Sequence, residues 1–266
     1  MDWITLRGVG KKFKSFDHPG DRVKELLTLG RRRYHKEYWA LRDVSLSIRQ
    51  GETFCIVGEN GSGKTTLLKC IAGAEIADRG TVTFQDIDIT TAPPAWRARR
   101  GMSLKFQITS VFDGLSVYDN VLLSLQADQT LWQLARSRSR RALHPRVLDV
   151  LGQFNLADRA NDLAGALSHG EQQWLEIAVA QARNPKLLLL DEPTAGMSPE
   201  ERRITGELLK PMKARCSLLI VEHDLDFIKD MSDVITVLGQ GQVLDHGTPE
   251  HIEASERVQE VYVTRV

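Results

Sequence analysis

The feature that most constrains this chain is a glycine-rich loop between an apolar run and a helical pattern. Residues 58–66 match the phosphate-binding pattern G-x-x-x-x-G-K-[ST] at every fixed position, as Gly58, Glu59, Asn60, Gly61, Ser62, Gly63, Lys64, Thr65 and Thr66. The apolar run 53–57 predicts a buried strand before the loop, and apolar residues at helical spacing predict a helix after it. In this context backbone N–H groups and a helix N-terminus can surround a phosphate. The sequence therefore predicts binding of a nucleoside triphosphate.

Two side chains of this loop have expected contacts with the nucleotide. Lys64 is expected to reach the β- and γ-phosphates, and the Thr65 hydroxyl is expected to bind Mg²⁺. The alternative is an ordinary glycine-rich turn between a strand and a helix. The complete motif, in its strand and helix context, argues against that alternative.

The composition is that of an ordinary globular protein, and the length allows one large domain or one domain with a subdomain. The 266 residues are 42% apolar and 26% charged, and the formal net charge is zero, so the overall charge requires neither nucleic acid nor an anionic membrane as partner. No apolar run approaches the roughly 20 residues that cross a bilayer, and the N-terminus has no apolar signal core. Three scattered cysteines in apolar contexts are expected to be reduced core residues of a cytosolic protein, namely Cys55, Cys70 and Cys216.

Strands alternate with helices along most of the chain, which predicts an α/β fold with a largely parallel core sheet. Helical periodicity dominates from 115 to about 166, so a helical subdomain is expected at about 107–166, between the core segments 1–106 and 167–266. Four arginines there lack interleaved aromatic residues and predict an exposed face, not a nucleic-acid site: Arg136, Arg138, Arg140 and Arg141. Strands are expected at 3–7, 41–48, 53–57, 81–84, 102–106, 186–192, 217–221, 234–238 and 242–244, and further helices at 200–212 and 225–231.

A basic insert at about 14–38 follows the first predicted strand. Basic residues outnumber acidic ones from Lys11 to Arg42, most densely at 31–33. One interpretation is a solvated helix with Asp21 as its N-cap and with the apolar residues Val23, Leu26 and Leu27. The other is an anion-facing patch near phospholipid head groups.

Polar residues stand where several predicted elements begin or end. Ser168 and Glu171 form an S-x-x-E capping box at the start of a predicted helix. Gln107 follows one predicted strand, Asp191 and Glu192 end the apolar strand 186–192, and His223 comes two residues after the strand 217–221. With the glycine loop and the segment 167–170, their order and spacing resemble those of ABC-transporter ATPases. P-loop kinases and GTPases lack the 167–170 element, and the resemblance covers nearly the whole chain.

This resemblance implies a P-loop NTPase fold with a mostly parallel core sheet, an antiparallel β part and an inserted helical subdomain. It also implies ATP and Mg²⁺ as cofactors, with Thr65, Gln107 and Asp191 at the metal, Asp191 through water. Glu192 is then expected to be the general base, and His223 to contact the γ-phosphate and hold the water. Gln107 is expected to link the catalytic core to the helical subdomain and to a membrane partner. A solvated carboxylate and a core histidine are the alternatives for Glu192 and His223.

The segment Ser168, His169, Gly170 and Glu171 resembles the family signature, which closes over the γ-phosphate of the opposite subunit in a head-to-tail dimer. ATP would thus join two copies, and hydrolysis would release them. Three positions depart from the common pattern. His169 replaces a glycine, Glu171 replaces a glutamine, and Ser198 stands where an aspartate often occurs.

Different segments are similar to different branches of the family. Residues 167–178, 191–198 and 258–262 are similar to the ATPases of branched-chain amino-acid, urea and short-amide importers. Residues 21–27 and 34–44 are similar to polysaccharide and O-antigen exporter ATPases. Four aromatic residues of the N-terminal part are candidates for stacking on adenine: Phe13, Phe16, Tyr34 and Tyr38.

The leading hypothesis is an importer ATPase for these solutes. It would act as a homo- or heterodimer on the cytoplasmic face of the inner membrane, with two permease subunits, an extracytoplasmic substrate-binding protein and no nucleic acid. The alternative is the ATPase of a polysaccharide exporter. A soluble ABC protein acting on ribosomes or DNA is disfavoured, because such proteins usually carry two cassettes or a long coiled coil.

Overall fold

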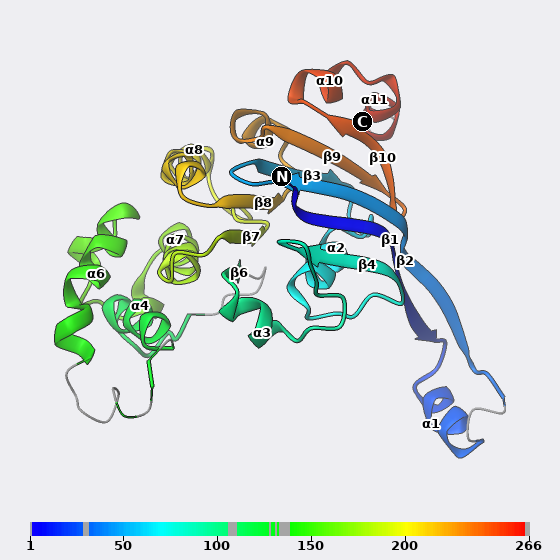
Figure 1. The fold of residues 1–266 in the computed structure, drawn as a ribbon, viewed down its shortest axis with the longest axis horizontal. Helices are drawn as coiled ribbons and strands as arrows, with labels where there is room; N and C mark the ends of the chain where they lie inside the picture. The colour runs from blue at the N-terminus through cyan, green and yellow to red at the C-terminus, as the bar shows by residue number, and fades with distance from the viewer. Residues whose placement is uncertain are drawn as a thin grey trace.

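The computed structural model describes residues 2–28, 32–105, 111–127, 129–130, 132 and 139–263. It confirms the α/β class, with a six-stranded, mostly parallel sheet and a four-stranded antiparallel sheet (Figure 1). The described residues contain no helix that is both long and apolar enough to cross a bilayer.

The parallel sheet brings several strand ends to one edge. Its order is β10-β9-β3-β8-β7-β6, and only β10 runs antiparallel to its neighbour. Strands β3, β7 and β8 are buried at every position, as their continuous apolar sequences predict. Their carboxyl ends therefore place the glycine loop, Asp191 and Glu222 at the same edge. The bounds are β3 Thr53–Gly58, β6 Met102–Lys105, β7 Leu187–Asp191, β8 Ser217–Val221, β9 Val234–Gly239 and β10 Gln242–Gly247.

The antiparallel sheet has the order β2-β1-β4-β5 and is longer than the sequence suggests. The expected strand 3–7 is part of a 15-residue strand, because β1 continues to pair with β2 beyond Gly10, where its pairing with β4 ends. The two strands then form a ribbon that projects from the body and carries helix α1 at its tip (Figure 1). The bounds are β1 Asp2–Phe16, α1 Pro19–Leu27, β2 His35–Arg49, β4 Arg79–Phe84 and β5 Ile87–Asp88.

The expected N-cap of α1 is wrong. His18 is the N-cap, and Asp21 lies in the first turn, where its carboxylate is 2.9 Å from Lys24 Nζ. The helix begins earlier because proline fits the first helical position, where its missing N–H is not needed.

Helices cover both faces of the parallel sheet. Cys55 and Val57 of β3 pack on the side of α4, α6 and α7, whereas Phe54 and Ile56 pack on the side of α2 and the antiparallel sheet. All three cysteines are free and buried. The helix bounds are α2 Lys64–Ala72, α3 Pro94–Arg99, α4 Val117–Gln126, α6 Ser139–Gln153, α7 His169–Gln181, α8 Pro199–Leu209, α9 Leu225–Met231, α10 Pro249–Ala254 and α11 Glu256–Val263.

Short 3₁₀ turns occur at Ala157–Arg159, Ala164–Ala166 and Lys210–Ala214. The helix expected to reach residue 212 ends at Leu209, because Pro211 cannot donate the backbone bond that would continue it.

Candidate functional site

The glycine loop is held tightly from outside. Gly63 has φ +102°, and a Cβ there would lie 2.5 Å from the carbonyl oxygen of Ala40. At Gly58 a Cβ would lie 2.3 Å from the carbonyl oxygen of Leu238. The loop therefore needs glycine at both positions, for reasons that include packing against β2 and β9 as well as phosphate access.

Lys64 turns back into this loop. Its buried Nζ donates to the carbonyl oxygens of Gly58, at 2.6 Å, and Glu59, at 3.0 Å. Burial lowers the pKa of Lys64, while the charges of Glu192 and Asp191 oppose that shift. The ammonium group thus lies among the residues where the triphosphate is expected.

Thr65 and Asp191 meet across the sheet edge. The Thr65 hydroxyl donates to Asp191 Oδ1 at 3.3 Å. Burial raises the pKa of Asp191, and the neighbouring Glu192 charge adds to the increase. Two hard oxygen donors in a poorly solvated site suit a divalent cation, which would remove the electrostatic cost of the carboxylate. These residues fit the expected Mg²⁺.

Glu192 adopts an unusual backbone conformation. Its φ is +45°, in the left-handed region, which costs a non-glycine residue roughly 1–2 kcal/mol. The conformation is fixed by the Glu192 N–H, which donates to the Val221 carbonyl at 2.9 Å. Such strain concentrates at functional sites, where the surrounding structure holds it.

Glu222 is a buried carboxylate that the sequence did not single out. It accepts hydrogen bonds from the Thr194 backbone N–H, at 3.0 Å, and from the Thr194 hydroxyl, at 2.5 Å. It also accepts one from the His223 N–H at 3.0 Å, while His223 Nδ1 lies 3.5 Å away and the imidazole is largely exposed. Glu222 therefore joins the loop after Glu192 to His223. In the sequence, the only indication of this carboxylate is the run of titratable residues 222–224 after the apolar strand 217–221.

The capping box at the start of α7 is confirmed. The Ser168 Oγ accepts from the Glu171 N–H at 3.3 Å, and Glu171 Oε2 accepts from the Ser168 N–H at 2.8 Å. Glu171 also lies 3.1 Å from Arg159 Nη1.

His169, the unusual residue of the signature, contacts the loop after Glu192. Its Nε2 is 3.0 Å from the carbonyl oxygen of Ala195. Gly196 has φ +73°, and a Cβ there would come within 2.9 Å of the imidazole. Gly170 packs similarly against α8, where a Cβ would lie 2.3 Å from Glu201 Oε1. The signature segment and the loop after Glu192 are therefore in direct contact within one chain.

Gln107 lies outside the described residues, as do Arg136 and Arg138. The strand that leads to Gln107 ends at Lys105, whose buried Nζ lies 3.6 Å from Glu176 Oε2 on α7. No local sequence pattern indicates this pair. Both residues lie in segments where apolar residues dominate.

The aromatic candidates for adenine fall into two groups. The rings of Phe13 and Tyr38 are 5.9 Å apart on the ribbon, next to the residues that contact Gly63. Phe16 and Tyr34 lie closer to α1, with Phe16 5.8 Å from the His35 ring.

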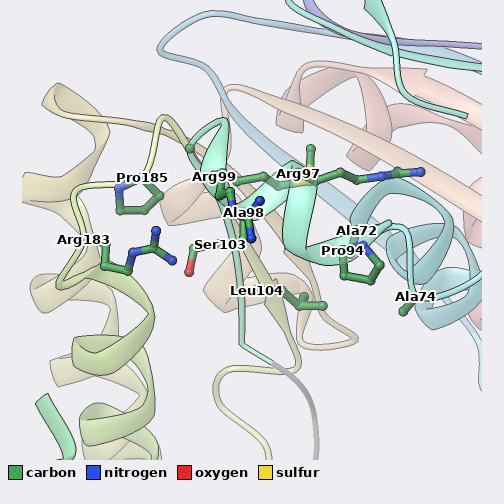
Figure 2. A pocket seen from close by; sticks show the side chains of 12 residues that line it. Ala72, Ala74, Pro94, Arg97, Ala98, Arg99, Ser103, Leu104, Arg183 and Pro185 are labelled. Carbon is green, nitrogen blue, oxygen red and sulfur yellow. The ribbon is translucent and has the colours of Figure 1, made fainter. Parts of the chain in front are cut away.

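A pocket of about 420 Å³ lies beside the β6 strand (Figure 2). Small and apolar side chains of α2, α3 and β6 line most of it. Arg99 and Arg183 also line it, and the Arg183 side chain points toward Ser103 in Figure 2. Arg97 is turned away and buried, and it donates to the carbonyl oxygens of Cys70 and Ile71 at 2.8 and 2.6 Å.

Comparison with known proteins identifies the family. Residues 41–195 match the ABC transporter family. The chain is 33% identical over 233 residues to the high-affinity branched-chain amino acid transport ATP-binding protein LivG of Salmonella typhimurium. This alignment covers 84% of this chain and 91% of LivG. It is 34% identical over 224 residues to the lipopolysaccharide export system ATP-binding protein LptB of Escherichia coli K12, with 84% and 90% covered.

Solved structures agree. The ADP conformation of the ABC-transporter cassette MJ1267 superimposes with a TM-score of 0.78 and 26% identity, over 99% of both chains. A dimeric post-hydrolysis state of the cassette MJ0796, bound to ADP and Pi, superimposes with a TM-score of 0.73 and 25% identity. The match covers 92% of this chain and 98% of the MJ0796 chain. The chain belongs to the ABC transporter family. It is an ATP-binding ATPase of that family.

Proposed function

We propose that this ATPase powers the import of branched-chain amino acids, urea or related amides. The observation that carries the proposal is the likeness to LivG over most of both chains, together with the importer-like segments 167–178 and 191–198. LptB is as similar, and the ribbon with α1 occupies the exporter-like segment. Export of a polysaccharide is therefore the second candidate.

We assign the predicted roles to the cluster at the sheet edge. Lys64 contacts the β- and γ-phosphates, where charge compensation matters most. Thr65, Asp191 and Gln107 hold Mg²⁺, which supplies charge neutralisation to the phosphates. Glu192 accepts a proton from the attacking water, and His223 holds that water near the γ-phosphate. The buried Glu222 fixes the backbone on both sides of this arrangement.

We further propose that Ser168, His169, Gly170 and Glu171 complete the site of a second copy or a similar subunit. The helix dipole of α7 and the N–H groups of its first turn favour an anion at this end. Phe13 and Tyr38 are the aromatic pair proposed to stack on adenine, because they lie nearest the strand segment that contacts Gly63.

The partners in this proposal are two permease subunits and an extracytoplasmic substrate-binding protein, with no nucleic acid. The ATPase is then peripheral on the cytoplasmic face of the inner membrane. The pocket beside β6 is the proposed contact for a permease segment with an apolar face and an acidic residue opposite Arg99 or Arg183 (Figure 2).

The catalytic assignment is tested with Glu192→Gln and Lys64→Ala. Glu192→Gln should lower ATP turnover at least about 100-fold, since a general base contributes that much, while ATP binding persists and dimers accumulate. Lys64→Ala should weaken ATP binding roughly 10- to 100-fold, because it removes charge-assisted hydrogen bonds. Parent-like hydrolysis by Glu192→Gln would show that the base is another group.

The transport assignment is tested by tagging the protein in its native cell and identifying the proteins that co-purify after gentle solubilisation. Recovery of two large permeases with a second ATPase supports import, and uptake assays then identify the solute. A small permease together with glycosyltransferases would instead support export. Recovery with ribosomes or DNA and without a membrane protein would contradict both.

A further inference from the structure

Helix α1 is held away from the body of the protein by the ribbon of β1 and β2. Beyond the Gly10–Arg79 pair, β1 is paired only with β2, from Lys12 opposite Trp39 to Phe16 opposite His35. Figure 1 shows α1 at the end of this ribbon, far from α4 and α6. The helix is therefore presented to whatever lies beyond the cassette.

One face of α1 fastens it to the ribbon. Glu25 Oε2 accepts from the Tyr34 N–H at 3.0 Å and lies 2.6 Å from His35 Nδ1. Lys14 Nζ is 3.7 Å from the other carboxylate oxygen. Glu25 therefore marks the inner face of the helix.

The opposite face is apolar and uncovered. At about 100° per residue, Val23, Leu26 and Leu27 fall within an arc of roughly 100° opposite Glu25. These three side chains are 57%, 75% and 76% exposed. Arg22 borders the arc on one side and Lys24 on the other, which is the arrangement of a helix that lies in a membrane interface.

The charges around α1 are unbalanced. Between residues 11 and 41, every acidic residue that the structure describes has a basic partner: Asp17 with Lys36, Asp21 with Lys24, Glu25 with Lys14 and His35, and Glu37 with Lys12. Arg22, Arg32 and Arg33 are exposed and have no acidic partner among the residues that the structure describes. Arg22 lies beside the apolar arc, and Arg32 and Arg33 lie in the connection between α1 and β2, so a complementary surface has both apolar and anionic groups.

We infer that α1 binds the surface of an anionic phospholipid bilayer, with Val23, Leu26 and Leu27 between the head groups and with Arg22, Arg32 and Arg33 on their phosphates. A single short helix of this kind binds weakly, and the two copies in a dimer reinforce each other. The inference concerns a surface outside the nucleotide site, and it is the same for an importer and an exporter.

The test is co-sedimentation of the full-length protein with vesicles of phosphatidylcholine alone or mixed with phosphatidylglycerol. We expect about hundredfold tighter binding to the anionic vesicles at low salt, because each of three cations near such a surface contributes about fivefold. Raising the salt to about 1 M should remove most of this preference, since the Debye length falls to about 3 Å.

Two sets of variants separate the apolar and charged parts. Leu26→Gln with Leu27→Gln should weaken binding at least about tenfold without changing ATPase activity, because these side chains have no role in the core. The matched control is Leu123→Gln with Leu148→Gln, two exposed leucines of α4 and α6, which should bind like the parent. Arg22→Gln, Arg32→Gln and Arg33→Gln together should abolish the preference for anionic vesicles.

Equal binding of the parent to both kinds of vesicle would overturn the inference, as would parent-like binding of the leucine variant. Binding only to vesicles that contain the permease subunits would also overturn it, and would assign the apolar face of α1 to a protein partner. None of these outcomes depends on which solute is transported, so they are distinguishable from a failure of the import assignment.

Discussion

Glu176→Leu tests whether the Lys105–Glu176 pair is a true buried ion pair. Lys105 Nζ and Glu176 Oε2 are 3.6 Å apart, and both side chains are 1% exposed. Burial lowers the pKa of Lys105, and Glu176 opposes that shift. Without its carboxylate partner, the buried ammonium should cost about 3–5 kcal/mol of the free energy of unfolding. That is a large share of the roughly 5–15 kcal/mol that stabilises a typical domain.

The loss in free energy of unfolding has an upper limit, because the buried Lys105 can lose its proton. Deprotonation costs about 1.36 kcal/mol for each pH unit below the ordinary lysine pKa, or roughly 4–5 kcal/mol at pH 7. In the variant the unfolded chain then binds one proton more than the folded chain, so the free energy of unfolding should rise with pH. Two pH units should restore about 2–3 kcal/mol between pH 7 and pH 9.

The assay is urea unfolding of the parent, Glu176→Leu, Lys105→Met and the double variant at pH 7 and pH 9. Replacement of both charges by apolar residues should be nearly neutral, because no charge is left buried. A loss below about 1 kcal/mol in both single variants would refute the argument, and so would a double variant whose loss equals the sum of the two single losses.

Three further predictions concern buried groups and the signature. Arg97→Met should lower the free energy of unfolding by about 3–5 kcal/mol, measured by urea unfolding, because it leaves several buried carbonyl groups without donors. His169→Gly should make the amides of residues 195–197 exchange with deuterium about fivefold faster, since it removes one hydrogen bond to Ala195, and His169→Gln should restore part of the protection. Burial raises the pKa of Cys55 to about 12 and those of the other two thiols to about 11, so the folded thiols should resist alkylation at pH 8. The free energy of unfolding should fall as the pH rises above about 9, because the thiols of Cys55, Cys70 and Cys216 lose their protons at lower pH in the unfolded chain than in the folded one.

The parts of the fold that the sequence predicted well are those with a regular apolar pattern, either a continuous run or residues at helical spacing. The strand at 217–221 and the helix at 225–231 have the expected bounds. The outer halves of β1 and β2 were missed because a two-stranded ribbon buries little, so its sequence carries no apolar alternation. Its lysines and glutamates indicate only a solvated segment, although they pair across the strands.

The candidate site divides in the same way. The positions of Lys64, Thr65 and Asp191 near one another follow from the motif and from parallel strands that end at one edge. Glu222 and Lys105 were missed because a charged residue after or within an apolar strand is usually solvated. Their burial depends on partners from other segments, which no local pattern contains.

Two of the positions that depart from the common family pattern, Ser198 and His169, can be explained together. Ser198 caps α8, and its hydroxyl also donates to Glu201 Oε2 at 2.7 Å. Aspartate would cap the helix equally well, but it has no proton to donate, and its carboxylate would face that of Glu201. Glu201 in turn packs against Gly170, next to His169, whose imidazole occupies the space left by the missing side chain of Gly196. The serine at 198 thus adds a hydrogen bond to the glutamate at 201, and the histidine at 169 needs the glycine at 196, so a change at any of these positions alters the contact between the signature helix and the loop that follows Glu192.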